Sequence, residues 1–257
     1  MDLMEAKDTA LSFLKSANKE TLKWFRSDYK VEFKKDESPV TIADKNTEEI
    51  LRKQISKSFP GHGIIGEEFG SETEDAEWVW TVDPIDGTRS FIRGLPFYSI
   101  LISLLRNGQP LIGIVSFPAL GEVYWAVKGQ GAYCGDLRVN VSNETQLKRS
   151  LVATADRYCF EEKKSLFLFD HLSREASLIR TYPDAFGHIL AIRGAVDIMV
   201  DPWACIWDFA PLKVLAEEAG GVFVNFSGNK NDIREGSAIV GNSQLAKFVR
   251  RVIAKGS

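Results

Sequence analysis

The sequence predicts a mixed α/β protein of the α+β kind, in which layers of helix and sheet pack together. Three observations predict this class. Apolar side chains recur at helical spacing through residues 3–25 and 42–58. Residues 97–134 form a run of apolar strands separated by Asn-Gly, Pro-Ala-Leu-Gly and Gly-Gln-Gly, which is typical of an antiparallel meander. From about residue 150 onward, strands and helices alternate.

The expected elements follow in order along the chain. In the front half, about residues 1–145, the two helices precede a strand over 78–82 and then the meander. Thr41 and Asp44 stand at capping-box spacing before the second helix. In the back half, about residues 146–257, we expect strands over 150–154, 177–182, 196–200, 222–226 and 237–241, and helices over 161–176, 185–194, 208–219 and the C-terminal residues. We expect both halves to form one domain over residues 1–257, because no linker or repeat separates them.

The composition excludes several classes of partner. The 32 basic and 35 acidic side chains leave a net charge of −3, without the basic patch that nucleic acid or an anionic membrane requires. The first residues lack a signal-peptide pattern, and no segment reaches the roughly 18–20 apolar residues that span a bilayer. Three cysteines, far apart and without a CxxC pair, indicate free thiols. We therefore expect a cytoplasmic protein without a nucleic-acid or membrane partner.

The segment WVWTVDPIDGT places two carboxylates directly after an apolar strand. Pro84 restricts the backbone between Asp83 and Asp86, so the carboxylates are held in a defined relation. Two close carboxylates repel unless a cation lies between them, and hard oxygen ligands suit Mg²⁺ at roughly 2.0–2.1 Å. The backbone amides of Gly87 and Thr88 can face an anion at a helix start. The alternative is that the segment forms an ordinary Asx-type turn. We interpret it instead as a site at which bound cations hold a phosphate.

Other acidic residues also stand where the expected elements begin or end. Glu67 and Glu68 follow a short apolar run in IIGEEFG, and Asp208 opens the helix of WDFAPLKVLAEEAGG. Asp208 alone is explained as a helix N-terminal charge worth roughly 0.3–1 kcal/mol, and Asp44 alone as a member of a capping box. For Asp208 and for Asp44, the local explanation and a role in the same site as Asp83 and Asp86 both stay open at this point.

The four motifs SPVTIADKNTEEIL, GEE, DPIDGT and WDFAPLKVLAEEAGG resemble those of the inositol monophosphatase family, in the family's order. They span about residues 34–221. The resemblance implies a layered α/β/α/β sandwich of the inositol monophosphatase and fructose-bisphosphatase type. It also implies a homodimer and a Mg²⁺-dependent, lithium-sensitive phosphatase that acts on a small phosphate monoester.

Carried over residue by residue, the resemblance implies two to three Mg²⁺ ions. Glu67, Asp83 and the Ile85 carbonyl resemble the ligands of the first ion. Asp83, Asp86 and Asp208 resemble those of the second ion, and Glu67 resembles a residue that helps to hold a third ion through water.

The resemblance also implies how the reaction proceeds. Thr88 and Asp44 match a pair that activates the attacking water, with Glu67 as a further catalytic residue, and the amides of Gly87 and Thr88 match the phosphate cradle. A metal-activated water would attack the phosphorus in line, without a phospho-enzyme.

The residues expected to contact the substrate are Asp86, Arg89, Tyr182, Asp184 and Asp201. Asp201 stands where inositol-type members place a glutamate that grips ring hydroxyls, and it is one methylene shorter. Tyr182, Pro183 and Asp184 depart from the inositol pattern. Asp184 and Arg89 are instead similar to residues of histidinol-phosphatase-like members.

The substrate is less constrained than the metal site. Asp184 and Asp201 could form an acidic pocket for a cationic amine or imidazole, or they could bind the vicinal hydroxyls of a polyol. Asp184 could also cap the following helix, and His188 could line the pocket or lie in the core. We favour histidinol phosphate, then inositol monophosphate, over 3′-phosphoadenosine 5′-phosphate or a sugar bisphosphate. The remaining alternative is a non-catalytic, metal-binding relative that acts through protein contacts.

Overall fold

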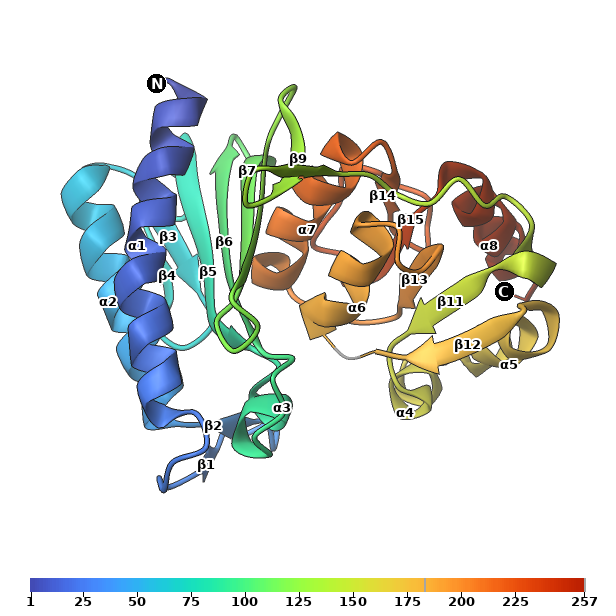
Figure 1. The fold of residues 1–257 in the computed structure, drawn as a ribbon, viewed down its shortest axis with the longest axis horizontal. Coiled ribbons are helices and arrows are strands. Elements are labelled where there is room, and N and C mark those ends of the chain that lie inside the picture. Colours follow the sequence, from blue (N-terminus) through green and yellow to red (C-terminus); the bar gives the residue numbers. More distant parts are fainter. Residues whose placement is uncertain (183, 257) are drawn as a thin grey trace.

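The computed structural model describes residues 1–182 and 184–256, and Figure 1 shows its helices and sheets stacked in layers. Helices α1 (Leu3–Trp24) and α2 (Ile42–Ser58) form the first layer, and an eight-stranded sheet forms the second. Helices α6 (Asp184–Ile192) and α7 (Ile206–Glu218) lie between this sheet and a five-stranded sheet. The layered sandwich predicted from the sequence is confirmed.

The eight-stranded sheet contains the predicted meander. Its strand order is β10-β9-β8-β7-β6-β5-β3-β4, and each pair is antiparallel except β3–β5. The strands are β3 (Gly63–Gly66), β4 (Gly70–Glu72), β5 (Trp78–Asp86), β6 (Ser99–Arg106), β7 (Gln109–Phe117), β8 (Glu122–Val127), β9 (Gly131–Cys134) and β10 (Leu137–Val139). Apolar residues of α1 and α2 cover one face of this sheet. On its other face α7 approaches β7 so closely that a Cβ at Gly113 would collide with the Pro211 carbonyl.

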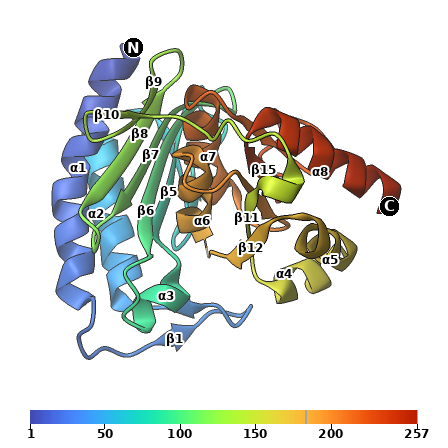
Figure 2. The same ribbon diagram turned by 45° about the vertical axis from the view of Figure 1, so that its right-hand side comes forward.

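The five-stranded sheet has the order β12-β11-β13-β15-β14. Its strands are β11 (Leu151–Thr154), β12 (Leu178–Thr181), β13 (Ile198–Asp201), β14 (Val222–Val224) and β15 (Ala238–Gly241). β11 pairs in parallel with β12 and with β13, so the carboxyl ends of three strands lie at one edge. Helices α4 (Arg157–Glu162), α5 (Leu166–Glu175) and α8 (Ser243–Gly256) add a further outer layer beyond this sheet (Figure 2).

Several predicted boundaries were wrong for local reasons. The helix expected over 161–176 is divided into α4 and α5, because Lys164 adopts a left-handed conformation (φ 54°) and the Ser165 amide bonds back to the Phe160 carbonyl. The strand expected to end at residue 82 continues through Asp86, and α7 begins at Ile206, before Asp208. The sequence reasoning also missed the short hairpin β1 (Glu32–Phe33) and β2 (Pro39–Val40) and the 3₁₀ turn Leu147–Arg149. The helix start expected at Gly87 and Thr88 is present as α3 (Thr88–Ile92).

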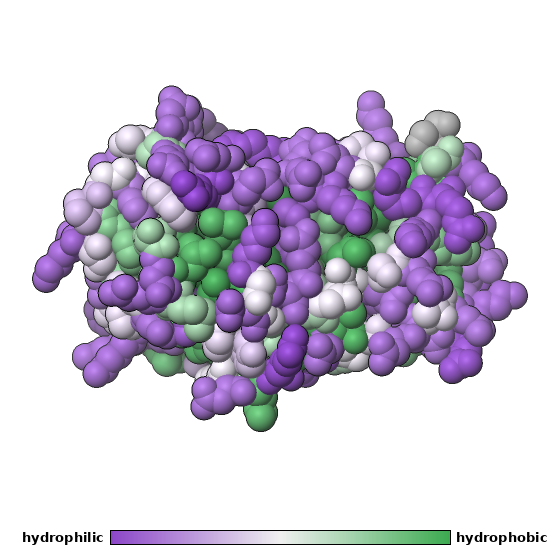
Figure 3. All heavy atoms as spheres, turned by 90° about the horizontal axis from the view of Figure 1, so that it is seen from above, coloured by the Kyte–Doolittle hydropathy of each residue, from purple (hydrophilic) through white to green (hydrophobic). Residues whose placement is uncertain are grey.

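Polar side chains cover most of the face seen in Figure 3, with apolar ones showing in patches between them. Within the described residues, none of the helices has the length and apolar character needed to cross a bilayer. The proposed division near residue 145 falls between β10 and β11 and stays a prediction.

Candidate active site

A β-bulge brings the two carboxylates of DPIDGT to the same side of the first sheet. Asp83 pairs with Leu101 of β6 and Asp86 with Ser99, so three steps along β5 oppose two steps along β6. Since side chains alternate along a regular strand, residues three apart would otherwise point to opposite faces. The extra residue therefore reverses the alternation and lets both side chains reach one site.

Asp208 joins these two carboxylates from a distant part of the chain. It is the third residue of α7, and its Oδ2 accepts a hydrogen bond of 2.7 Å from the Cys205 amide. Oxygen atoms of Asp83, Asp86 and Asp208 all lie within 4.8 Å of one another. The helix-cap interpretation and the metal-ligand interpretation of Asp208 are thus compatible, since the carboxylate has a second oxygen beside the Oδ2 that binds the Cys205 amide.

The cluster is electrostatically unfavourable without a cation. Burial, followed by the charges of Glu67, Asp208 and Asp86, raises the pKa of Asp83 well above its ordinary value. Burial also raises the pKa of Asp86 and of Asp208, with neighbouring carboxylates adding to the shift. Hydrogen bonds from the Ile85 amide to Asp83 (3.0 Å) and from Ser99 to Asp86 (2.9 Å) fix the side chains. Rigid, buried, closely spaced hard oxygen donors fit a bound divalent cation such as Mg²⁺.

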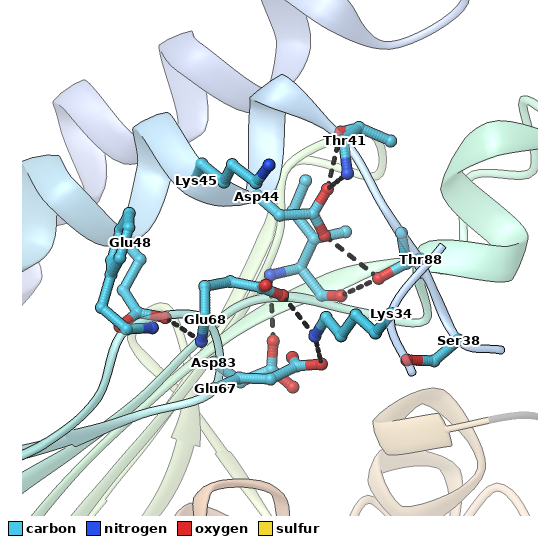
Figure 4. Close-up of polar contacts among 12 residues, drawn as sticks. Lys34, Ser38, Thr41, Asp44, Lys45, Glu48, Glu67, Glu68, Asp83 and Thr88 are labelled. Atoms are coloured by element: carbon cyan, nitrogen blue, oxygen red, sulfur yellow. Dashed lines mark hydrogen bonds and ion pairs between the residues drawn. The ribbon is translucent and has the colours of Figure 1, made fainter. Parts of the chain in front are cut away.

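Asp44 and Thr88 meet beside this cluster (Figure 4). Asp44 Oδ2 accepts hydrogen bonds from the Thr41 amide (2.8 Å) and hydroxyl (2.6 Å), which completes the predicted capping box of α2. Its Oδ1 lies 3.1 Å from the Thr88 hydroxyl, which is also 3.0 Å from the Ile85 carbonyl oxygen. Burial raises the pKa of Asp44. One side chain therefore both caps a helix and contacts Thr88.

Glu67 and Glu68 lie in the connection between β3 and β4, and the ammonium of Lys34 joins them (Figure 4). Lys34 Nζ is 2.7 Å from an oxygen of each glutamate. Burial, with the charge of Glu67 second, raises the pKa of Glu68 to about 7. Burial alone would lower the pKa of Lys34, but its hydrogen bonds to Glu67 and Glu68 raise it overall. The sequence reasoning missed Lys34, because the charged segment FKKDESPV does not distinguish it from Lys35.

Two adjoining cavities surround these groups. The first, of about 400 Å³, is lined by residues that include Glu67, Asp83, Ile85, Asp86, Thr88 and Asp208. The second, of about 240 Å³, is lined by residues that include Asp86, Asp156, Asp184, Asp201, Trp203 and Asp208. Asp86 and Asp208 line both cavities, so the carboxylate cluster forms the boundary between them.

The predicted substrate residues Asp184 and Asp201 both line the second cavity, but their carboxylates have different surroundings. Asp184 reaches it because Gly87, in a left-handed conformation (φ 81°), leaves room: a Cβ at Gly87 would lie 2.7 Å from Asp184 Oδ2. Asp201 also lines it, but its carboxylate accepts from the Trp203 amide and lies 3.1 Å from Nε2 of the buried His188. His188 is therefore both a core residue and a lining residue.

Two other predicted positions, Tyr182 and Arg89, have a different placement. Tyr182 packs against Phe186 with ring centroids 6.1 Å apart, and it is not among the described residues lining the second cavity. Arg89 is exposed and lies near enough to Asp184 to oppose the rise of its pKa. Pro183 lies outside the described residues. The structure adds Asp156 and Trp203 to the lining, and the ammonium of Lys163 lies 3.2 Å from the Trp203 ring centroid.

Comparison with known proteins agrees with this geometry. Residues 3–255 match the sequence profile of the inositol monophosphatase family. The chain belongs to this family. A histidinol-phosphatase of Chlorobaculum parvum is 36% identical over 248 residues, covering 96% of each protein. An inositol-1-monophosphatase of Mesorhizobium japonicum is 30% identical, covering 84% of this chain and 83% of that protein.

A solved structure extends the comparison to the whole fold. The extragenic suppressor protein suhB of Bartonella henselae superposes with a TM-score of 0.91 at 27% identity, covering 98% of this chain and 100% of that one. The protein is accordingly a phosphatase of the inositol monophosphatase family, a hydrolase of small phosphate monoesters. The family is metal-dependent, and the cluster of Asp83, Asp86 and Asp208 is compatible with a metal.

Proposed function

We propose that the protein is a Mg²⁺-dependent phosphatase whose substrate is the phosphate monoester of a small amino alcohol, with histidinol phosphate the first candidate. The convergence of Asp83, Asp86 and Asp208 within 4.8 Å carries the proposal, because buried carboxylates at that spacing need a compensating cation.

The residues that would hold Mg²⁺ come from three places in the chain: the β3–β4 connection, β5 and α7. Glu67, Asp83 and the Ile85 carbonyl would hold one ion, and Asp83, Asp86 and Asp208 a second. Glu67 would help to hold a third. Bound there, Mg²⁺ would supply charge neutralisation to the phosphate and lower the pKa of the attacking water.

The chain's own groups would position and deprotonate that water. The Thr88 hydroxyl donates toward Asp44 Oδ1, 3.1 Å away, so its oxygen can accept a hydrogen bond from a water in the first cavity. Burial raises the pKa of Asp44 and makes its carboxylate a better proton acceptor. The proton would pass from water to Thr88 Oγ1 as the Thr88 proton passes to Asp44. The amides of Gly87 and Thr88 would bind the phosphate oxygens.

The second cavity supports a cationic leaving group. Five aspartates line it, namely Asp86, Asp156, Asp184, Asp201 and Asp208, and none of its described lining residues is a lysine or arginine. An ammonium or imidazolium group would be stabilised there, whereas the second phosphate of a nucleotide or sugar bisphosphate would be repelled. The similarity to histidinol-phosphatases supports the same class. Inositol monophosphate is the second candidate, supported by the inositol-1-monophosphatase relatives.

We also propose that the protein forms a homodimer in the cytoplasm. The family resemblance supports the dimer, and three cysteines without disulfides support a reducing compartment. Light scattering of the purified protein would give its molar mass in solution, and the mass of a monomer would contradict the proposed dimer.

Phosphate release measured with and without Mg²⁺ tests the activity. The panel should contain histidinol phosphate, inositol 1-phosphate, fructose 1,6-bisphosphate and 3′-phosphoadenosine 5′-phosphate. We expect release to require Mg²⁺ and kcat/KM to be highest for histidinol phosphate. Failure of the folded protein to release phosphate from any of these esters would favour the non-catalytic alternative, and a preference for a bisphosphate would contradict the acidic-cavity argument.

A further inference from the structure

The connection that carries Glu67 and Glu68 is only three residues long, and its backbone is anchored from α2. Glu48 Oε2 accepts a hydrogen bond of 2.7 Å from the Glu68 amide, and its Oε1 accepts one of 3.2 Å from the Phe69 amide. Figure 4 shows the Glu48 side chain extending from the helix to this turn. Two consecutive amides of the turn are therefore bound by one carboxylate.

Glu48 is fully buried, and Arg52 compensates its charge. Arg52 Nε lies 2.8 Å from Glu48 Oε1, and the guanidinium also donates to the Gly70 carbonyl at the start of β4. Gly66, the last residue of β3, leaves the space for this arrangement, since a Cβ there would collide with the Glu48 carboxylate. The pair thus contacts the residues on both sides of Glu67, and neither Glu48 nor Arg52 forms a side-chain hydrogen bond to Glu67 among the described residues.

The same helix fixes the other half of the predicted catalytic machinery. Asp44 and Glu48 are four residues apart on α2, so their side chains project from one face of the helix. Asp44 contacts Thr88, beyond the end of β5, while Glu48 binds the turn after β3. Helix α2 consequently contacts both Thr88 and the Glu67 turn, in addition to the pairing of β3 with β5 that joins the two segments.

We propose that Glu48 and Arg52 are positioning residues that fix Glu67 for metal binding. The inference rests on the proposed function, in which Glu67 is a ligand of Mg²⁺. A flexible turn would have to be ordered when the ion binds, whereas a turn whose amides are already bound requires no such ordering. Partners of metal ligands typically change metal affinity by about 10–100-fold when they are replaced.

The test measures Mg²⁺ affinity by calorimetry without substrate, together with the thermal midpoint of the metal-free protein. Glu48→Gln retains one acceptor oxygen and should raise the Kd for Mg²⁺ by about 10-fold, and Glu48→Ala by up to about 100-fold. Arg52→Met should raise the Kd as well, because it leaves the Glu48 charge uncompensated.

The chain offers a matched control on the same helix. Glu49 and Lys53 form an ion pair at the same spacing, and both side chains are exposed. Glu49→Gln should leave both the Kd and the thermal midpoint unchanged. A purely structural role for Glu48 would lower the thermal midpoint without changing the Kd for Mg²⁺, and that result would overturn the inference.

The outcomes separate the inference from the function on which it rests. If the wild-type protein binds Mg²⁺ and the Glu48 and Arg52 variants bind it equally well, the positioning role is wrong and the proposed function stands. If the wild-type protein itself binds no Mg²⁺, both are wrong. Should Glu48→Ala fail to fold, Glu48→Gln and Arg52→Met decide the question, with rescue of affinity by Arg52→Lys as supporting evidence.

Discussion

Replacing Asp83 with asparagine should stabilise the metal-free protein while abolishing its activity. Two unit charges no more than 4.8 Å apart, a bound that holds for every pair in the cluster, repel by at least about 3.5 kcal/mol at an effective dielectric constant of about 20. Asp83 takes part in two of the three pairs. Because a proton held by the cluster already relieves part of this repulsion, we expect a net gain of about 3 kcal/mol at pH 8.

Asparagine also suits the position sterically. Its carbonyl oxygen can keep the 3.0 Å hydrogen bond from the Ile85 amide, and its NH₂ group can donate to Asp208. Chemical denaturation at pH 8 in a chelator should therefore show a higher free energy of unfolding. For a chain of this size, a gain of about 3 kcal/mol corresponds to a thermal midpoint roughly 6–12 °C higher.

The pH dependence of the stability tests whether the carboxylate cluster destabilises the metal-free protein. Burial raises the pKa of Asp83, Asp86 and Asp208 in the folded state, so the folded protein holds more protons than the unfolded chain at pH values above 3.8. The stability of the metal-free wild-type protein should consequently fall as the pH rises, and Asp83→Asn should make that fall shallower. Mg²⁺ should raise the stability of the wild-type protein at high pH but should not raise that of the variant.

Two results would refute this reasoning. One is a variant less stable than the wild-type protein at pH 8 without metal. The other is an equal Mg²⁺-induced rise of the thermal midpoint in both proteins. Asp75→Asn, at an exposed position before β5, is the matched control and should change neither quantity.

Other substitutions test neighbouring groups. Lys34→Met should lower the Kd for Mg²⁺ about fivefold, because the ion no longer displaces a partly exposed ion pair worth about 1 kcal/mol. Lys35→Met, at an exposed position, is its control. Equal Kd values for Lys34→Met and the wild-type protein would contradict the assignment of Glu67 as a metal ligand. Thr88→Ala should lower kcat by about 100-fold with an unchanged Kd for Mg²⁺, measured by steady-state kinetics and calorimetry. Burial, and then the charge of Asp201, raises the pKa of Asp184 to about 7, so KM for histidinol phosphate should rise as the pH falls below 7 and this carboxylate is protonated. Asp184→Asn should raise the KM for histidinol phosphate at least about 10-fold at pH 8 and remove its pH dependence. The same substitution should change the KM for inositol 1-phosphate less. Equal changes in the two KM values would argue against a cationic substrate.

The parts of the site that local chemistry determines could be predicted from the sequence. The capping-box spacing of Thr41 and Asp44 is local, and so is the closeness of Asp83 and Asp86 along the chain, so both pairs could be found in short segments. That Asp83 and Asp86 face the same side depends on the bulge in β5. Asp208 could be assigned only through the family resemblance, because its approach to Asp83 depends on the packing of α7 against the first sheet.

The features that were missed depend on contacts between distant segments. Nothing in the local sequence predicts the bulge in β5, because it appears only in the register with β6. Glu48 is one of two adjacent glutamates on an apparently ordinary helix, and only the position of the β3–β4 turn distinguishes it from Glu49. The division of the helix expected over 161–176 depends on a single left-handed residue, Lys164, where lysine has no special preference for that conformation.

The topology explains how one metal site can serve relatives named for different substrates. The carboxylates of the first cavity come mainly from the first sheet and α7, whereas the second cavity is lined by residues that follow β11, β12 and β13: Asp156, Asp184 and Trp203. These three strands are parallel, so the segments after them converge at one edge of the second sheet, where ligands characteristically bind in open α/β sheets. Asp83 and Asp86 are held by the pairing of β5 with β6, so changes in those connections that keep the hydrogen bond from the Ala185 amide to Asp86 Oδ2 alter mainly the lining of the second cavity. Substrate preference should therefore depend on these three connections, and exchanging them between this chain and an inositol-specific relative should change the preferred ester while leaving the Kd for Mg²⁺ unaltered.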